Sequence, residues 1–171
     1  MPPLKWHNVC REVSYFRQGG HSGELILWGE SMQFDASRHK CTIVIDEALA
    51  VGLAMNAASV IGISFGKTFE NLVGPDLSSG DGVRYPGVIY APLPVLRAPN
   101  ATIQALLNSA GDDEDIYSMP FSALAQSCRT YDEYGERISA VNSEHIELVA
   151  IGLVGPKKKI TRLTGNLPLF K

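Results

Sequence analysis

The stretch Lys40-Cys-Thr-Ile-Val-Ile-Asp46 decides the fold, because it is a short run of mostly apolar residues rich in β-branched side chains. A run of this length and composition predicts a buried strand rather than a helix. It leads into Gly52-Leu-Ala-Met-Asn-Ala-Ala-Ser-Val-Ile-Gly62, an alanine-rich segment that predicts a helix over residues 50–65. One stripe of that helix, which we expect to face the sheet, consists of Leu53, Ala57, Val60 and Ile61.

The rest of the chain continues this alternation of strands and helices. Residues Val88–Ala91 predict a second strand, which ends early because Pro92 and Pro94 cannot donate a hydrogen bond to a neighbouring strand. Further predicted elements are a helix capped by Asn100, a strand over Ile116–Met119, one long helix over Phe121–Ala140 with Tyr131 facing inward, a strand over Ile146–Leu153 and a helix over Pro156–Leu163. This order predicts an α/β fold: a three-layer sandwich around a mixed sheet of about four strands.

Length, charge and cysteine content narrow the class of protein. The chain has 171 residues, of which 45% are hydrophobic, and this suits one globular domain with an extension. A net charge of -3 argues against general, nonspecific binding of nucleic acid. The three cysteines have no metal-like spacing, and their odd number disfavours a disulfide framework. No run is apolar and long enough to span a membrane, so we expect a protein of the reducing cytoplasm without a membrane partner.

Residues 1–31 differ from the sequence that follows them. They contain one apolar burst, Leu25-Ile-Leu-Trp28, but no sustained hydrophobic period. One interpretation makes them an extra strand or hairpin on the edge of the domain, and the other makes them a poorly ordered extension upstream of Met32. The absence of a hydrophobic period in residues 1–31 favours the poorly ordered extension. We therefore expect an extension over residues 1–31 and one domain over residues 32–171.

The C-terminal segment carries a family resemblance. The run Ile160-Thr-Arg-Leu-Thr-Gly165-Asn-Leu-Pro-Leu-Phe170 resembles the final helix and tail of type II peptidyl-tRNA hydrolases, with Leu-Thr-Gly-x-Leu-x-Leu as the specific part. The first strand and its alanine-rich helix are similar to the opening unit of those enzymes. A closer resemblance is to a bacterial group described as domain of unknown function 2000, which shares their fold. The residues that fit this group are Ala125-Gln126, Tyr131, Tyr134 and Gly155-Pro-Lys-Lys-Lys159.

The resemblance implies a peptidyl-tRNA hydrolase II-like fold over residues 32–171 but does not carry the activity with it. The hydrolases place a Gly-Lys pair at the start of the first helix and a histidine shortly after. Leu53 stands at the lysine position here, Val60 stands near the histidine position, and no aspartate is in register near Gly135. We therefore expect a divergent enzyme that acts on a small or acyl-type ligand. A non-catalytic binding or regulatory module and a residual peptidyl-tRNA hydrolase remain as alternatives, as do a homodimer and tRNA as partners.

Three residues mark a candidate site where the first strand meets the first helix. Asn56 lies on the predicted inward stripe, where an amide is costly unless it is paired. It either orients a ligand beside Gly52 or ties down a loop. Asp46 ends the strand and is a candidate catalytic group, because ligands of open α/β sheets sit outside the carboxyl ends of strands. The alternative for Asp46 is a helix cap that complements the helix dipole.

A second group of candidates lies in the loop Asp81-Gly-Val-Arg-Tyr-Pro-Gly87. This loop holds a carboxylate on Asp81, a guanidinium on Arg84 and an aromatic ring on Tyr85. We expect it to close over a substrate at the end of the sheet that carries Asp46 and Asn56. The alternative is that a contact between Asp81 and Arg84 only holds the loop together.

The remaining polar clusters carry weaker predictions. Lys157-Lys-Lys159 with Arg162 forms either a phosphate-binding face at a helix start or a solvated basic face. His145 has no second ligand at metal spacing, and no serine or threonine has the neighbours of a nucleophilic triad. The sequence therefore predicts neither a metal site nor a cofactor.

Overall fold

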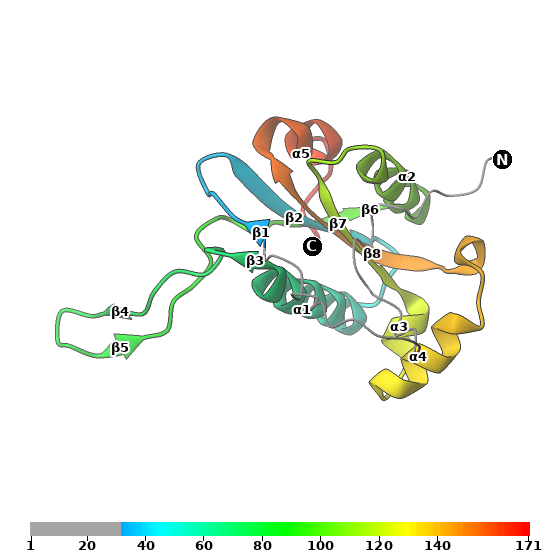
Figure 1. Ribbon diagram of the computed structural model, residues 1–171, viewed down its shortest axis with the longest axis horizontal. Helices are drawn as coiled ribbons and strands as arrows, with labels where there is room; N and C mark the ends of the chain where they lie inside the picture. The colour runs from blue at the N-terminus through cyan, green and yellow to red at the C-terminus, as the bar shows by residue number, and fades with distance from the viewer. Residues whose placement is uncertain (1–31) are drawn as a thin grey trace, which may run out of the picture.

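The computed structural model describes residues 32–171 (Figure 1). Alternating strands and helices build it, as the sequence predicts. The strands are β1 (Met32–Gln33), β2 (His39–Asp46), β3 (Phe69–Glu70), β4 (Leu77–Ser78), β5 (Arg84–Tyr85), β6 (Val95–Ala98), β7 (Tyr117–Ser122) and β8 (Leu148–Pro156). The helices are α1 (Val51–Thr68), α2 (Asn100–Gly111), α3 (Ala123–Ser127), α4 (Tyr131–Ser139), α5 (Lys157–Thr164) and a short 3₁₀ turn over Ser143–His145.

Four strands form the main sheet, in the order β6-β2-β8-β7. Strand β6 runs parallel to β2, whereas β8 runs antiparallel to both β2 and β7. The two central strands, β2 and β8, are buried along most of their length. Burial on both faces explains why both strands read as continuous apolar runs instead of alternating patterns. The predicted α/β class and the mixed sheet of four strands are confirmed.

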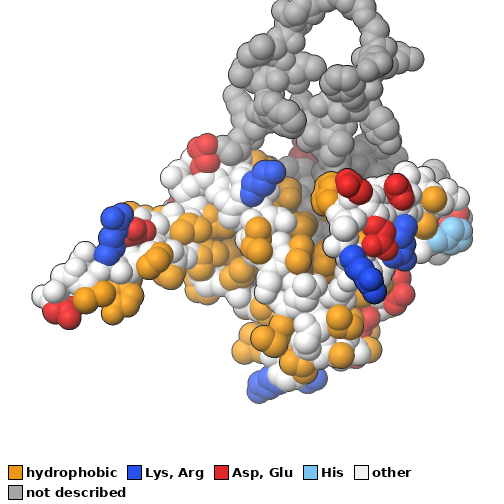
Figure 2. Space-filling model, turned by 90° about the horizontal axis from the view of Figure 1, so that it is seen from below, with side chains coloured by type: hydrophobic (Ala, Val, Ile, Leu, Met, Phe, Trp, Pro, Cys, Tyr) orange, Lys and Arg blue, Asp and Glu red, His pale blue; other side chains and the backbone are white. Residues whose placement is uncertain are grey.

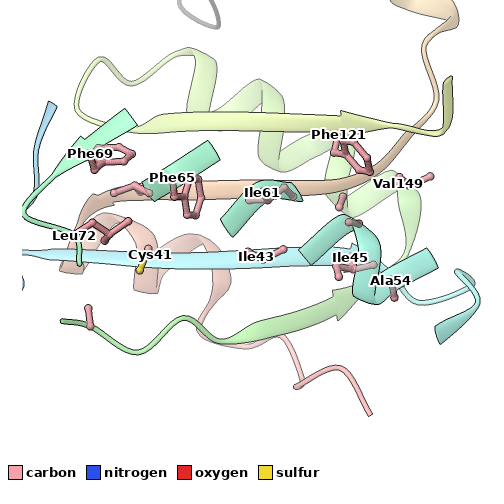
Figure 3. Packing of buried hydrophobic residues seen from close by; sticks show 14 of the residues in the cluster. Cys41, Ile43, Ile45, Ala54, Ile61, Phe65, Phe69, Leu72, Phe121 and Val149 are labelled. Atoms are coloured by element: carbon pink, nitrogen blue, oxygen red, sulfur yellow. The ribbon is translucent and has the colours of Figure 1, made fainter. Parts of the chain in front are cut away.

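Helices cover both faces of this sheet (Figure 1). Helix α1 packs on one face, and its buried residues Ala57, Ile61 and Phe65 join Ile43 and Ile45 of β2 in one core cluster (Figure 3). Helices α2 and α5 pack on the opposite face. There they form a second core cluster with β2, β6 and β8, whose fully buried members include Ile103, Ile151 and Ile160. The arrangement is therefore helix, sheet, helix, with apolar side chains filling both gaps.

Gly152 lets α1 approach β8 closely. A Cβ atom at this position would lie 2.5 Å from Cγ2 of Ile61 and 2.5 Å from Cζ of Phe65. These distances are far below a van der Waals contact, so a side chain at residue 152 cannot be accommodated unless the helix or its side chains move. The glycine sets the spacing between the first helix and the sheet.

Two of the predicted elements are wrong. The strand expected at Val88–Ala91 is replaced by an isolated bridge between Val73 and Ile89, and the edge strand β6 begins only after Pro94. Proline lacks an amide hydrogen, so regular pairing with β2 starts once the prolines have passed. The long helix expected over Phe121–Ala140 is broken at residues 128–130 into α3 and α4.

The break has a local cause, because each short helix has its own N-cap. The Ser122 hydroxyl accepts a hydrogen bond from the Ala125 amide, and the Thr130 hydroxyl accepts one from the Glu133 amide. An N-cap residue has non-helical backbone, so a cap at Thr130 ends the helical path there. Tyr131, expected to face inward, is 85% exposed as a result.

Residues 74–88 form an arm that projects away from the sheet and helices (Figure 1). Its base is closed by a hydrogen bond from the Gly74 amide to the Val88 carbonyl at 2.9 Å. Further out, β4 and β5 pair antiparallel, with Leu77 opposite Tyr85. The arm follows α1 and the short strand β3, which pairs with β1. It contributes no residue to either buried core cluster.

The expectation that residues 1–31 form an extension lies outside the described residues. Among the helices of residues 32–171, none combines the length and the apolar character needed to cross a bilayer.

Candidate functional site

The carboxyl end of β2 brings together Asp46 and the start of α2. The Asp46 carboxylate accepts a hydrogen bond from the Ala48 amide at 2.9 Å through Oδ1, and one from Asn100 Nδ2 at 3.3 Å through Oδ2. The same Asn100 amide group donates to the Leu148 carbonyl of β8. Asn100 therefore connects the ends of two neighbouring strands, and Asp46 closes the turn that leads into α1.

Asn100 differs from its predicted role. Pro99, not Asn100, occupies the N-cap of α2, and Asn100 is the first helical residue. Proline is compatible with this position because the first amides of a helix have no partner inside the helix. The Asn100 side chain is thereby released from capping and turns to β2 and β8.

The first turns of α1 follow this end of β2 in the chain. Gly52 has nothing within 4 Å of an added Cβ, and Leu53 is 47% exposed. Asn56 is exposed, and its Oδ1 accepts a hydrogen bond from Gln126 Nε2 at 3.1 Å. Gln126 also donates to the Leu53 carbonyl at 2.9 Å, so it fastens α3 to α1. We call Asp46, Gly52, Leu53, Asn56, Asn100 and Gln126 the β2-end site.

The expectation that Asn56 and Leu53 face the sheet is wrong. Two residues of the predicted stripe, Ala57 and Ile61, are buried as expected, and Ala54 and Phe65 complete the buried side of α1. The helix is apolar on nearly all sides, so its hydrophobic pattern does not fix which side is buried. Asn56 is consequently a solvent-facing amide held by Gln126 and not a buried polar group.

The candidates of the second group lie on the arm. Asp81 Oδ1 accepts a hydrogen bond from the Ser79 hydroxyl, and this bond, together with backbone amides, lowers the pKa of Asp81. Arg84 pairs with Asp76 at 2.8 Å and not with Asp81. Tyr85, which pairs with Leu77, is exposed. The loop is stabilised internally, as the structural alternative expected, but by different partners.

The structure does not bring the two groups together. The β2-end site adjoins the N-terminal end of α1, and the arm follows its C-terminal end (Figure 1). A helix of 18 residues is about 27 Å long. The arm also points away from the sheet, so Asp81, Arg84 and Tyr85 do not close over Asn56 of the same chain. The expected convergence of the loop on the β2 end is wrong within one copy.

The basic residues of α5 are partly tied into the fold. Lys159 Nζ lies 2.7 Å from Asp113 Oδ1 and 2.7 Å from Asp115 Oδ2. The hydrogen bond from Lys159 lowers the pKa of Asp113, and the two acidic partners raise the pKa of Lys159. Lys157, Lys158 and Arg162 line only a shallow depression. Lys159 therefore attaches α5 to the turn before β7.

Gln126 and Asn100 are the site residues that the sequence reasoning missed. The local sequence around each residue does not reveal its role, because the hydrogen-bond partners that define this role are distant in the sequence. Gln126 contacts residues 70 and 73 positions away, and Asn100 contacts residues 48 and 54 positions away. The one available signal was the Ala125-Gln126 pair of the family resemblance.

We predict that Asn56→Ala changes the free energy of unfolding by no more than about 0.5 kcal/mol. The side chain is exposed, and Gln126 keeps its bond to the Leu53 carbonyl after the substitution. Gln126→Ala is the matched control, since it removes both bonds, and it should cost about 1 kcal/mol. Urea unfolding of the three proteins measures both changes. A loss above about 2 kcal/mol for Asn56→Ala would show a structural role instead.

Comparisons with known proteins support a family assignment. A solved protein of unknown function, Atu0240 from Agrobacterium tumefaciens strain C58, matches with a TM-score of 0.63 and 16% identity. The match covers 78% of this chain and 98% of Atu0240, and at this identity it shows the fold alone. A comparison with curated proteins gives no match. The family model described as protein of unknown function (DUF2000) matches residues 39–171, and the chain therefore belongs to the DUF2000 family.

Proposed function

We propose that this DUF2000 protein is a divergent enzyme with a peptidyl-tRNA hydrolase II-like fold, and that it binds a small acyl-type ligand at the β2-end site. The observation that carries the proposal is the open first turn of α1 beside the carboxyl end of β2. Gly52 offers no side chain there, and the space around it is empty to at least 4 Å. Exposed backbone amides at such a helix start favour a carboxylate or a polarised carbonyl.

The side chains of the site have complementary roles in this proposal. Because Gln126 holds Oδ1 of Asn56, the Nδ2 group of Asn56 is the part that donates to a ligand carbonyl. Asp46 uses each carboxylate oxygen for one hydrogen bond within the protein, and each oxygen keeps a further lone pair. Asp46 is thus able to accept a hydrogen bond from a ligand hydroxyl or amide, or to hold an attacking water.

The fold part of the proposal rests on residues as well as topology. Strand β2 with helix α1, and the antiparallel strand β8 with helix α5, span the segments that resemble the hydrolases. The Leu-Thr-Gly ending falls on the end of α5, where Thr164 is buried and donates a hydrogen bond to the Ile160 carbonyl at 2.8 Å. The tail then returns to the sheet, where the Phe170 amide donates to the Val95 carbonyl at 2.9 Å. The specific motif of the resemblance therefore has a structural role.

A non-catalytic binding module is the second candidate function, and Leu53 favours it. Its aliphatic side chain stands where the hydrolases carry lysine, and it is half exposed on the first turn of α1. An aliphatic group cannot donate a proton or stabilise a developing negative charge. Ligand binding without turnover separates this candidate from the first.

Binding is tested by ¹H–¹⁵N NMR titration of the full chain with N-acetylglycine and N-acetylglycine methyl ester. We expect the largest amide shifts at residues 51–56 and in the Gln126 side chain. Gly52→Leu should abolish these shifts, because its side chain occupies the open space without a clash within the fold. Gly135→Leu is the matched control, since Gly135 is also a helical glycine with open surroundings. Shifts confined to other residues, or none with either probe, would contradict the proposed site.

We predict that the purified protein does not release tRNA from N-acetylaminoacyl-tRNA at the rate of a dedicated hydrolase. The reason is Leu53 in place of lysine, together with the absence of an aspartate in register near Gly135. Losing a group that stabilises charge costs about 100- to 1,000-fold in turnover. A type II peptidyl-tRNA hydrolase in the same assay is the positive control. Turnover within tenfold of that enzyme would contradict the prediction.

A further inference from the structure

Large exposed apolar side chains are concentrated on two elements of residues 32–171. Thirteen such side chains are exposed, and ten of them lie on or beside the arm or on α1. The arm and its base carry Val73, Leu77, Val83, Tyr85, Val88 and Tyr90, and α1 carries Val51, Leu53, Met55 and Ile63. Figure 2 shows the apolar side chains along the arm, seen from the α1 side of the sheet. Contiguous apolar patches of this kind mark interaction surfaces.

The outer side of α1 lacks the charged residues of an ordinary surface helix. No Asp, Glu, Lys or Arg occurs between Val51 and Gly66. Met55 and Ile63 are exposed on this side, Asn56 and Ser59 add two uncharged polar groups, and Gly66 leaves it free of a side chain at one further position. A surface helix whose outer side faces solvent normally carries charged residues opposite its buried stripe. The outer side of α1 is therefore suited to contact another protein surface.

The arm lacks the support that a hairpin normally needs. Strands β4 and β5 contain two residues each, and an isolated two-stranded hairpin is marginally stable in water. Its only cation, Arg84, pairs with Asp76 of the same arm. The arm consequently presents Leu77, Tyr85 and Val88 without an unpaired positive charge, and it gains stability when these side chains are covered.

The two surfaces match in size. Each leg of the arm has about seven residues and a length of roughly 23 Å at about 3.3 Å per residue. Helix α1 has 18 residues and is about 27 Å long. Ten large side chains that are about half to three-quarters exposed offer on the order of 50–100 Å² each. The sum is comparable with the ~800 Å² that each partner contributes to a standard interface.

We propose that the protein forms a two-fold homodimer in which the arm of each copy lies along the outer side of α1 of the other copy. One chain supplies both a projecting arm with exposed apolar side chains and an uncharged helix side, so two copies cover both arms and both helix sides at once. A two-fold exchange of this kind closes on itself and leaves no apolar surface to recruit further copies. This inference concerns assembly and does not rest on the ligand proposed above.

The role of the outer side of α1 is tested by comparing the full chain with its Gly66→Arg variant in sedimentation velocity. The substitution has open space around Cβ and improves helix propensity, so it does not unfold α1. It places a second long cation beside Lys67 in the last turn of α1, at the C-terminal end of the uncharged side, and we expect the dimer dissociation constant to rise by at least about 30-fold. Gly135→Arg, a helical glycine of α4 with equally open surroundings, is the matched control and should leave the dimer unchanged.

The arm is tested by replacing residues 76–86 with Asn-Gly. The hydrogen bond from Gly74 to Val88 and the bridge between Val73 and Ile89 close the base, so the core is preserved. This variant should be monomeric, with a circular dichroism spectrum and a cooperative thermal transition like those of the unmodified protein. A mixture of the armless variant with Gly66→Arg should regain a weaker dimer, because one intact arm meets one intact helix side.

Three outcomes would overturn the proposal. If the full chain is monomeric at millimolar concentration, a second copy does not cover the outer side of α1, and residues 1–31 or a different protein would be the candidates to cover it. A dimer that survives in both variants would place the interface elsewhere. A dimer lost only in the armless variant, with no recovery on mixing, would mean that the two arms pair with each other.

Discussion

Replacement of Gly152 by valine should lower the free energy of unfolding by about 3 kcal/mol, the upper part of the range for overpacked cores. Valine is a better strand residue than glycine, so local propensity alone predicts a gain of stability. The packing reverses this sign, because the new Cβ would lie 2.5 Å from both Ile61 and Phe65. Chemical denaturation followed by circular dichroism measures the change.

Two further variants show whether the clash is the cause. Gly135→Val should change stability by less than about 1 kcal/mol, since nothing lies within 4 Å of an added Cβ and the expected effect is a small gain in helix propensity. In a double-mutant cycle, Ile61→Ala with Gly152→Val should be more stable than the sum of the single losses, by about 1–3 kcal/mol. Simple additivity would contradict the close approach of α1 to β8.

Phe65→Ala should cost about 3–5 kcal/mol, the largest loss that we expect from one side chain. Phe65 is fully buried between α1 and β8, and its ring meets Phe69 and Tyr117 edge to face, each with ring centroids 6.2 Å apart. The cavity left by alanine is walled by a strand and a helix that cannot both move inward. The thermal midpoint should fall by more than 10 °C, on the scale of about 4 °C per kcal/mol.

Tyr131→Ala is the control for this aromatic deletion. Tyr131 is exposed on α4 and stacks edge to face on Tyr134. Its loss should cost less than about 1 kcal/mol. Equal losses for the two variants would mean that the core around Phe65 is loosely packed.

The sequence predicts the central layers well because strands that are buried on both faces have a distinctive composition. The run Cys41–Ile45 and the run Leu148–Val154 are apolar at nearly every position, which no surface element tolerates. The predictions that were wrong concern elements whose limits depend on a single residue. The cap at Thr130 breaks a helix whose apolar pattern appears continuous, and Pro94 delays an edge strand by several residues.

The β2-end site was only partly predictable, for a different reason. Asp46 and Gly52 follow from the position of one strand end and one helix start, which local sequence indicates. The environment of Asn56 depends on which side of α1 meets the sheet, and a helix that is apolar all round does not specify that side. The direction of the arm is set by the strand pairing at its base, between residues 73 and 89, and no local pattern encodes it.

The position of β8 in the sheet also determines when the domain is able to fold during synthesis. Among the strands of residues 32–171, β8 is synthesised last, yet it lies between β2 and β7 and is the only neighbour of β7 in the sheet that the structure describes. Until it emerges, β2 exposes one unpaired apolar edge, and unpaired edges of this kind favour aggregation. The core therefore cannot close until β8 has been synthesised, and we expect the yield of the protein in cells to depend on chaperones that bind extended apolar segments.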